Sequence, residues 1–137
     1  MDKIFIDTDA LVALNNLSDK LHNRALEAAK KINGKSYQYY IGLNILMETL
    51  TIVSQRCGKK QANALLKELR SENYIVLNPS QEEILIAEEI FANARSKNLS
   101  YSDCISFAVM KTHNISQAFS FDIHFKKHGF KRISIDK

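Results

Sequence analysis

The chain has 137 residues, of which 45% are hydrophobic, and its two cysteines, Cys57 and Cys104, lie far apart without a zinc-type spacing. This composition fits one domain over residues 1–137 that needs neither disulfides nor structural zinc, and no run approaches the roughly 20 apolar residues of a membrane helix, so we expect a cytoplasmic protein. The net charge of +4 lies in the last 27 residues, with six Lys and Arg against two Asp and Glu, which favours a polyanionic partner such as nucleic acid.

Short β-rich runs alternate with stretches that have the spacing of amphipathic helices. In chain order, strands are expected at residues 3–6, 37–41, 74–77, 117–121 and 132–135. Helices are expected at residues 10–17, 19–32, 43–56, 59–70, 80–97 and 105–110. Ser80 with Glu83, and Ser100 with Asp103, have the spacing of N-terminal caps, and Gly34 suits a left-handed position after the second helix. The alternation predicts a three-layer α/β/α domain with a mostly parallel central sheet of four to five strands.

Four of the 15 acidic residues stand in apolar surroundings, where an unpaired carboxylate is costly. Asp7 and Asp122 each follow an apolar run, Asp103 begins a helix, and Glu48 lies within a nearly apolar helix. Each has a structural alternative: a helix cap for Asp7 or Asp103, a turn for Asp122 and a buried ion pair for Glu48. Ligands of parallel sheets bind beyond the carboxyl ends of the strands, so we expect the four acids to meet there. Their repulsion calls for a divalent cation, and oxygen ligands suit Mg²⁺ or Mn²⁺.

Four segments together resemble the PIN-domain family of small metal-dependent ribonucleases, which includes the toxins of VapBC-type toxin–antitoxin pairs. These segments are IFIDTDALVAL, LMETLTIV, LSYSDCISFAVM and AFSFDIHFKKHGF. The resemblance implies an endoribonuclease that uses Mg²⁺ or Mn²⁺, an RNA substrate, a cognate antitoxin and a homodimer. It places the family's catalytic and metal-binding quartet on Asp7, Glu48, Asp103 and Asp122. It also implies supporting roles, next to the ligands, for Thr8 and Ser120.

Two positions depart from the family pattern. Gly42 stands where a small hydroxyl residue is common about six positions before the glutamate, and Asp9 adds a fifth carboxylate. We expect Asp9 to cap the first helix rather than to bind metal, and His124 to pack in a turn rather than to contact phosphate or metal. Basic residues after the last acid are candidate contacts for an RNA backbone, with a solvated basic surface as the alternative: Lys126, Lys127, Lys131 and Arg132.

Two other functions remain open from the residues. The Asp7-Thr8-Asp9 segment is similar to the DxD motif of haloacid-dehalogenase-type phosphatases, in which the first Asp attacks phosphorus and the second acts as acid and base. That family also needs paired acids late in the chain, where this sequence offers only Asp122. The other alternative is a PIN-like module that processes or only binds RNA and has no toxin role.

The two helices expected at residues 43–56 and 59–70 carry more apolar residues than one core face uses. Such a surface would serve dimerisation or antitoxin docking, with core packing as the alternative for several of these positions. The residues concerned are Leu46, Leu50, Val53, Leu65 and Leu69.

Overall fold

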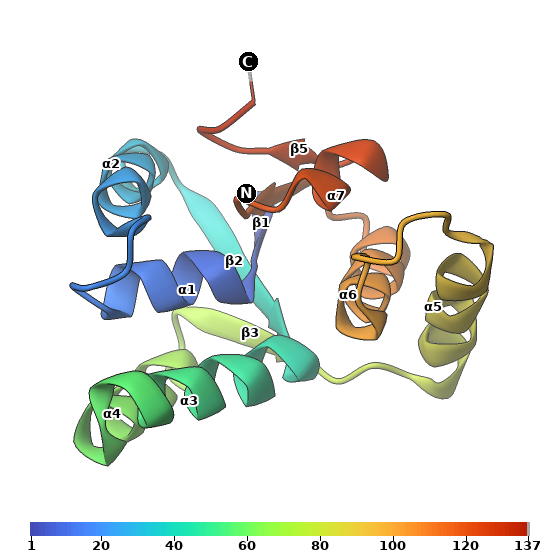
Figure 1. Ribbon diagram of the computed structural model, residues 1–137. Coiled ribbons are helices and arrows are strands. Elements are labelled where there is room, and N and C mark those ends of the chain that lie inside the picture. Colours follow the sequence, from blue (N-terminus) through green and yellow to red (C-terminus); the bar gives the residue numbers. More distant parts are fainter. Residues whose placement is uncertain (137) are drawn as a thin grey trace.

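The computed structural model describes residues 1–136, which form a parallel sheet between two layers of helices (Figure 1). Within these residues the sheet has five strands in the order β3-β2-β1-β4-β5, and each neighbouring pair is parallel. The predicted α/β/α architecture is therefore confirmed. The strands are β1 (Asp2–Ile6), β2 (Tyr37–Gly42), β3 (Tyr74–Leu77), β4 (Gln117–Phe119) and β5 (Lys131–Arg132).

Helices α1 to α4 cover one face of the sheet, and α5 to α7 cover the other (Figure 1). The helices are α1 (Thr8–Asn15), α2 (His22–Asn33), α3 (Leu43–Cys57), α4 (Lys59–Leu69), α5 (Gln81–Asn93), α6 (Tyr101–Thr112) and α7 (Ile123–Lys127). The chain first winds outward from β1 to β3 and then returns past β1 to β4. The connections after β1 and β4 thus leave on opposite faces, which creates a crevice between the two strand ends.

The core holds this crevice in place from both sides of the sheet. β1 is central and covered on both faces, so Ile4 and Phe5 are fully buried and the strand has no polar alternation. On the face that α5 to α7 cover, Phe107 of α6 packs against Phe125 of α7, with 4.9 Å between ring centroids. The acidic residues at the strand and helix ends are therefore carried by well-packed elements.

No helix among the described residues has the length and apolarity needed to cross a membrane.

The structure corrects several expected element boundaries. Gly34 has a right-handed φ of −70°, not the left-handed conformation expected, because its N–H continues the helical pattern to the Lys30 carbonyl. The expected strand at 117–121 ends at Phe119, since Ser120 already turns away to form the site. Helix α7 was not expected from the sequence, because a five-residue helix is too short to show a period.

The apolar residues that could have formed a docking surface on α3 and α4 pack inside the protein, as the alternative of core packing predicts. Leu46, Val53, Leu65 and Leu69 belong to the buried core, and Leu50 is partly buried against it. The two helices pack on each other as well as on neighbouring elements, so they use more than one apolar face internally.

Candidate active site

Asp7 begins the site at the end of the central strand. Its N–H donates to the Phe119 carbonyl at 3.0 Å, which ties it to β4. Its carboxylate accepts hydrogen bonds from the Thr8 N–H at 2.9 Å and from the Ser120 hydroxyl at 2.7 Å. Asp7 is only 6% exposed, and burial, followed by the charge of Asp9, raises the pKa of Asp7 well above its ordinary value. Asp7 is thus both the N-cap of α1 and a buried carboxylate at the crevice.

Ser120 connects the first acid of the chain to the last. While its hydroxyl donates to Asp7, the same oxygen accepts the N–H of Asp122 at 3.0 Å. Ser120 is fully buried, so these contacts are shielded from water. The loop after β4 and the loop after β1 are thereby held in register at the strand ends.

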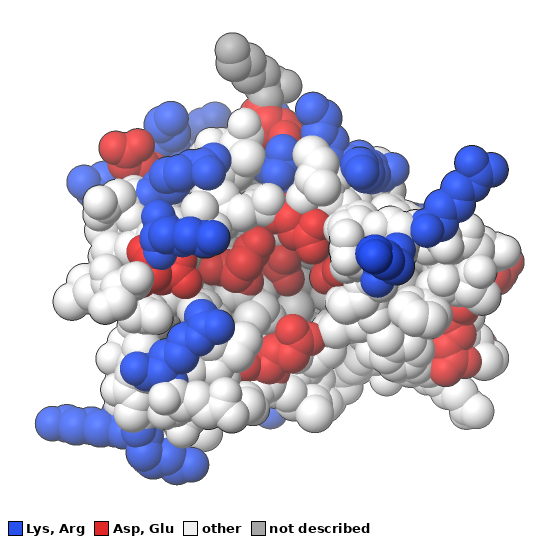
Figure 2. All heavy atoms as spheres, viewed as in Figure 1, with Lys and Arg blue, Asp and Glu red and all other residues white. Residues whose placement is uncertain are grey.

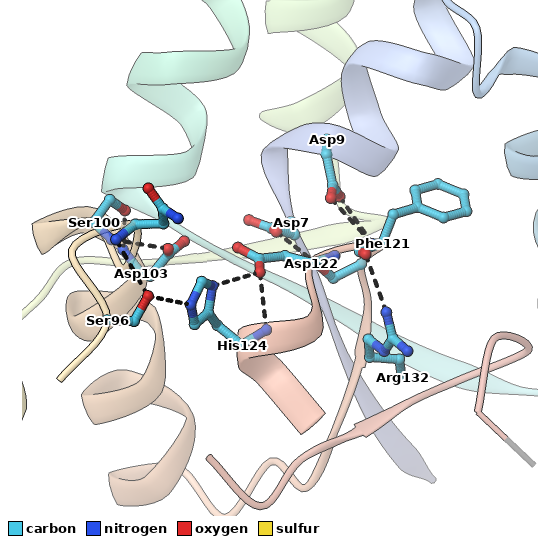
Figure 3. Close-up of polar contacts among 11 residues, drawn as sticks. Asp7, Asp9, Ser96, Ser100, Asp103, Phe121, Asp122, His124 and Arg132 are labelled. Atoms are coloured by element: carbon cyan, nitrogen blue, oxygen red, sulfur yellow. Dashed lines mark hydrogen bonds and ion pairs between the residues drawn. The ribbon is translucent and has the colours of Figure 1, made fainter. Parts of the chain in front are cut away.

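Asp103 and Asp122 lie at the starts of two helices and face one another across the crevice (Figure 3). Asp103 completes the predicted capping box, because its carboxylate accepts the Ser100 N–H at 3.1 Å. Asp122 caps α7 and contacts His124 twice, at the backbone N–H and at Nδ1, each at 2.9 Å. One ligand atom from each of Asp103, Asp122 and His124 lies within 4.8 Å of the other two, a spacing that a single cation can bridge.

His124 lies in this cluster although sequence reasoning assigned it to turn packing. Its Nδ1 faces Asp122, and its Nε2 lies 3.2 Å from the Ser96 hydroxyl (Figure 3). The signal that could have revealed it is the spacing Asp122-x-His124, which directs both side chains to one end of α7 when Asp122 is the N-cap.

Glu48 reaches the same cleft from α3, where it is exposed rather than half of a buried ion pair. The cleft has a volume of about 300 Å³. On the molecular surface, carboxylates gather in a hollow with Lys and Arg side chains around it (Figure 2). The cleft is lined by Asp7, Thr8, Asp9, Val12, Asp19, Leu21, Glu48, Ile52, Arg56, Asp103 and Asp122. All four predicted acids are thus brought together.

Asp9 does not cap the first helix, contrary to the expectation from sequence. The helix begins at Thr8, so the cap position falls on Asp7, and Asp9 lies in the first turn. Its two carboxylate oxygens instead accept the Phe121 N–H at 3.1 and 3.3 Å (Figure 3). Burial raises the pKa of Asp9 to about 6, against the lowering effect of the Phe121 hydrogen bond. Burial also raises the pKa of Asp103.

The basic residues of the last segment fall into two groups. Arg132 is held by Asp136, with 2.9 Å between Nη2 and Oδ1, and it donates to the Phe121 carbonyl at 3.0 Å. It therefore supports the loop that carries Asp122 and has little freedom to contact RNA. Lys126, Lys127 and Lys131 are exposed.

Asn44 occupies the space next to Gly42, where the PIN pattern commonly has a hydroxyl. A Cβ atom on Gly42 would collide with the Asn44 amide oxygen. The Asn44 amide nitrogen donates to the Ser102 carbonyl and hydroxyl, both at 3.0 Å, and to the Ser106 hydroxyl at 3.1 Å. Asn44 thus fastens the start of α3, four residues before Glu48, to the first turns of α6.

The donor set fits a divalent cation. Carboxylate oxygens dominate the cleft, and hard cations such as Mg²⁺ and Mn²⁺ prefer oxygen. Three of the carboxyl groups have raised pKa values, with the charge of a neighbouring acid among the causes in each case. A cation would relieve this repulsion. Thr8 adds a buried hydroxyl oxygen without a hydrogen-bond partner among the described residues.

Comparison with known proteins identifies the family and the fold. The PIN domain family model matches residues 4–131. The 23S rRNA-specific endonuclease VapC20 of Mycobacterium tuberculosis is 30% identical over 131 residues, which are 95% of this chain and 97% of VapC20. The crystal structure of VapC20, described as a sarcin–ricin loop cleaving toxin, superposes with a TM-score of 0.85 at 28% identity and covers 95% of this chain and 98% of that chain.

A more distant structure shares the fold alone. FitAcB from Neisseria gonorrhoeae superposes with a TM-score of 0.67 at 16% identity, over 93% of this chain and 94% of that chain. The family model and VapC20 both extend over most of the chain, including the segments that carry Asp7, Glu48, Asp103 and Asp122. This chain therefore belongs to the PIN-domain family.

Proposed function

We propose that this chain is a metal-dependent endoribonuclease, that residues 1–137 act as one nuclease domain, and that it is the toxin of a toxin–antitoxin pair. The observation that carries the proposal is the meeting of Asp7, Glu48, Asp103 and Asp122 in one cleft. The similarity to VapC20 over nearly the whole chain supports the reaction class.

In this proposal the quartet holds Mg²⁺ or Mn²⁺. Such an ion would lower the pKa of water and stabilise charge on the phosphate during in-line attack. The chain itself supplies orientation. Ser120 fixes Asp7 relative to Asp122, and Ser100 fixes Asp103 through the capping box. The hydrogen bonds from Thr8 and Ser120 also favour the ionised form of Asp7, against the effect of burial.

The proposed substrate is RNA with unpaired nucleotides. Lys126 and Lys127 of α7 and Lys131 of β5 are exposed close behind Asp122 in the chain, which suits contacts to the RNA backbone. Because VapC20 is named for cleavage of 23S rRNA at the sarcin–ricin loop, a hairpin with this loop is the first substrate to test.

The site supports neither a DxD phosphatase nor a module that only binds RNA, whereas a PIN-like RNA-processing enzyme would use the same four carboxylates. In a DxD phosphatase, Asp9 would act as acid and base, whereas here its two oxygens accept the Phe121 N–H, and the chain belongs to the PIN family rather than to the phosphatases. A module that only binds RNA would not need four carboxylates in one cleft.

We also propose that the protein forms a homodimer and binds a cognate antitoxin, as its similarity to the toxin VapC20 suggests. Light scattering at micromolar concentration tests the first, and co-purification with the product of a neighbouring gene tests the second. A monomer that purifies alone from its native operon contradicts both.

The decisive experiment is cleavage of the sarcin–ricin hairpin with Mg²⁺ or Mn²⁺ and again with excess chelator. We expect cleavage only with the ion, and a loss of at least about 100-fold for Glu48→Gln, because changes beyond the ligand shell already cost 10- to 100-fold. Glu72→Gln, which alters an exposed acid outside the cleft, is the matched control. Undiminished cleavage in excess chelator contradicts the metal mechanism.

A further inference from the structure

One wall of the cleft is acidic at one end only. Glu48, Ile52 and Arg56 follow one another at intervals of four residues, so they form a stripe along one side of α3. Val12 of α1 and Leu21 before α2 add apolar surface to the same cleft. The lining therefore changes from carboxylate to aliphatic to cationic along α3.

Arg56 is available to a ligand at the far end of this stripe. Its side chain is exposed and takes part in none of the ion pairs of residues 1–136. Asp19, which also lines the cleft, uses its carboxylate to accept the Leu21 N–H at 2.8 Å. The positions of Glu48 and Arg56 differ by about 12 Å along the helix axis, so Arg56 suits a phosphate beside the reacting one rather than the reacting one itself.

We propose that this stretch of the cleft binds the unpaired nucleotide next to the scissile phosphate. The base lies against Ile52, Val12 and Leu21, and the guanidinium of Arg56 holds the adjoining phosphate. This proposal rests on the proposed function and narrows its substrate class.

The size and chemistry of the wall select an unpaired nucleotide. The cleft has a volume of about 300 Å³, at the lower end of small-ligand sites, which suits a single nucleotide. A base stacked in a duplex cannot offer its face to aliphatic side chains, whereas a loop base can be splayed out. Arg matches a phosphate with two parallel donors.

The test is RNA binding in the non-cleaving Asp7→Asn background, measured by fluorescence anisotropy. The probes are a labelled sarcin–ricin hairpin and a fully paired RNA duplex of the same length. Adding Arg56→Ala should weaken hairpin binding about tenfold, as expected for a charged hydrogen bond, and reduce the salt slope by about 0.7. Adding Arg56→Lys should weaken hairpin binding by a smaller factor than Arg56→Ala, because a point charge replaces a bidentate contact.

Two further variants separate the subsite from general charge attraction. Arg70→Ala removes the same charge from an exposed residue outside the cleft and should change hairpin affinity less than twofold. Ile52→Ala should weaken hairpin binding and leave the salt slope unchanged, with its folding checked by thermal unfolding. The affinity for the paired duplex should be the same with and without Arg56→Ala.

The outcomes also separate this proposal from the proposed function. The subsite is contradicted if Arg56→Ala and Arg70→Ala weaken hairpin binding equally, or if Arg56→Ala weakens hairpin and duplex binding equally. It is also contradicted if the Asp7→Asn protein does not bind the hairpin. If the unaltered protein does not cleave the hairpin with Mg²⁺ or Mn²⁺ while Arg56 still governs hairpin binding, the nuclease proposal fails and the subsite stands.

Discussion

At the scale of single residues, the site depends on uncharged side chains as much as on acids. The Ser120 hydroxyl contacts both Asp7 and the backbone of Asp122, and it does so without exposure to water. A buried hydroxyl with both its donor and its acceptor in use has one favoured orientation. The position of Asp7 is therefore set by β4 as well as by its own strand.

Removing this hydroxyl should alter the pH dependence of cleavage. Ser120→Ala deletes a hydrogen bond that lowers the pKa of Asp7, so that pKa rises further and ionisation requires a higher pH. We expect about tenfold slower cleavage at pH 7, partial recovery at pH 9, and a loss of about 1–2 kcal/mol of stability from the unsatisfied N–H of Asp122. Rate profiles from pH 5 to 9 test this, and an equal loss at every pH contradicts it.

Asp7 and Asp9 should respond differently to the same substitution. Asp7→Asn removes a charge from the ligand set and should abolish both cleavage and the rise in unfolding temperature on adding Mn²⁺. Asp9→Asn keeps an oxygen that can accept the Phe121 N–H and should retain most activity. Thermal unfolding with and without Mn²⁺, beside the cleavage assay, checks both. An inactive Asp9→Asn beside an active Asp7→Asn contradicts the assignment of the first ligand.

Sequence reasoning found the four acids because each combines an apolar setting with the end of an element. It misplaced Asp9 because the exact start of α1 decides which acid becomes the cap, and periodicity does not fix a start to within one residue. It set His124 aside because its contact with Asp122 requires α7. Arg132 was grouped with free cations, since its partner Asp136 becomes a neighbour only in the fold.

At the scale of elements, the contact between α3 and α6 sets how far Glu48 stands from Asp103. Asn44 makes this contact through its amide nitrogen, whose two hydrogens are shared among three oxygens in the first turns of α6. These bonds hold the amide in place, so it cannot move aside cheaply for a side chain on Gly42. The width of the cleft is therefore determined by Asn44, which does not line the cleft.

A double-mutant cycle should expose this coupling. Gly42→Ser alone should destabilise the protein by about 1–3 kcal/mol, because the new side chain collides with the Asn44 amide. Asn44→Ala alone should cost a similar amount through lost hydrogen bonds. The two together should cost less than their sum, because the serine then fills the vacated space. Denaturant unfolding measures the three values, and strict additivity contradicts the coupling.

Most elements were predictable, whereas α7 and the bounds of β5 were not. The strands at β1 to β3 and the helices at α3 and α4 were placed within a few residues, because their apolar spacing extends over whole elements. β5 has only two residues, and its pairing with β4 is what makes it a strand. Such pairing is a tertiary contact that local spacing does not contain.

At the scale of the whole molecule, clustered carboxylates make stability depend on pH when metal is absent. The pKa of Asp9 rises from 3.8 to about 6 on folding, so between these values the folded state binds more protons than the unfolded state. Stability therefore falls as pH rises through this window. Glu83 and Asp136, whose pKa values are lowered, contribute fully above about pH 4.5 and lose their contributions as pH falls below it, so they affect only the lowest part of this window. His128 opposes the trend, because burial lowers its pKa below 6.5.

Comparing the chelated protein with Asp9→Asn isolates the acidic contribution, since His128 is common to both. The variant should unfold at a higher temperature than the parent at pH 7, by about 4 °C for each kcal/mol of relieved repulsion, and the gap should close towards pH 4. Scanning calorimetry at pH 4, 5.5 and 7 measures it. A gap that stays constant or widens towards acid contradicts this origin.

The placement of β1 in the middle of the sheet has a consequence during protein synthesis. Asp7 and Ser120 are 113 residues apart in the chain, and β1 needs β4 as its second neighbour. While the ribosome is still adding the last strands, the emerging chain has its first carboxylates but lacks the segment that orients them, and pairing across such a separation is slow to form. A nascent chain thus has no assembled cleft next to the ribosome that produces it, and the nuclease geometry arises only once synthesis is nearly complete.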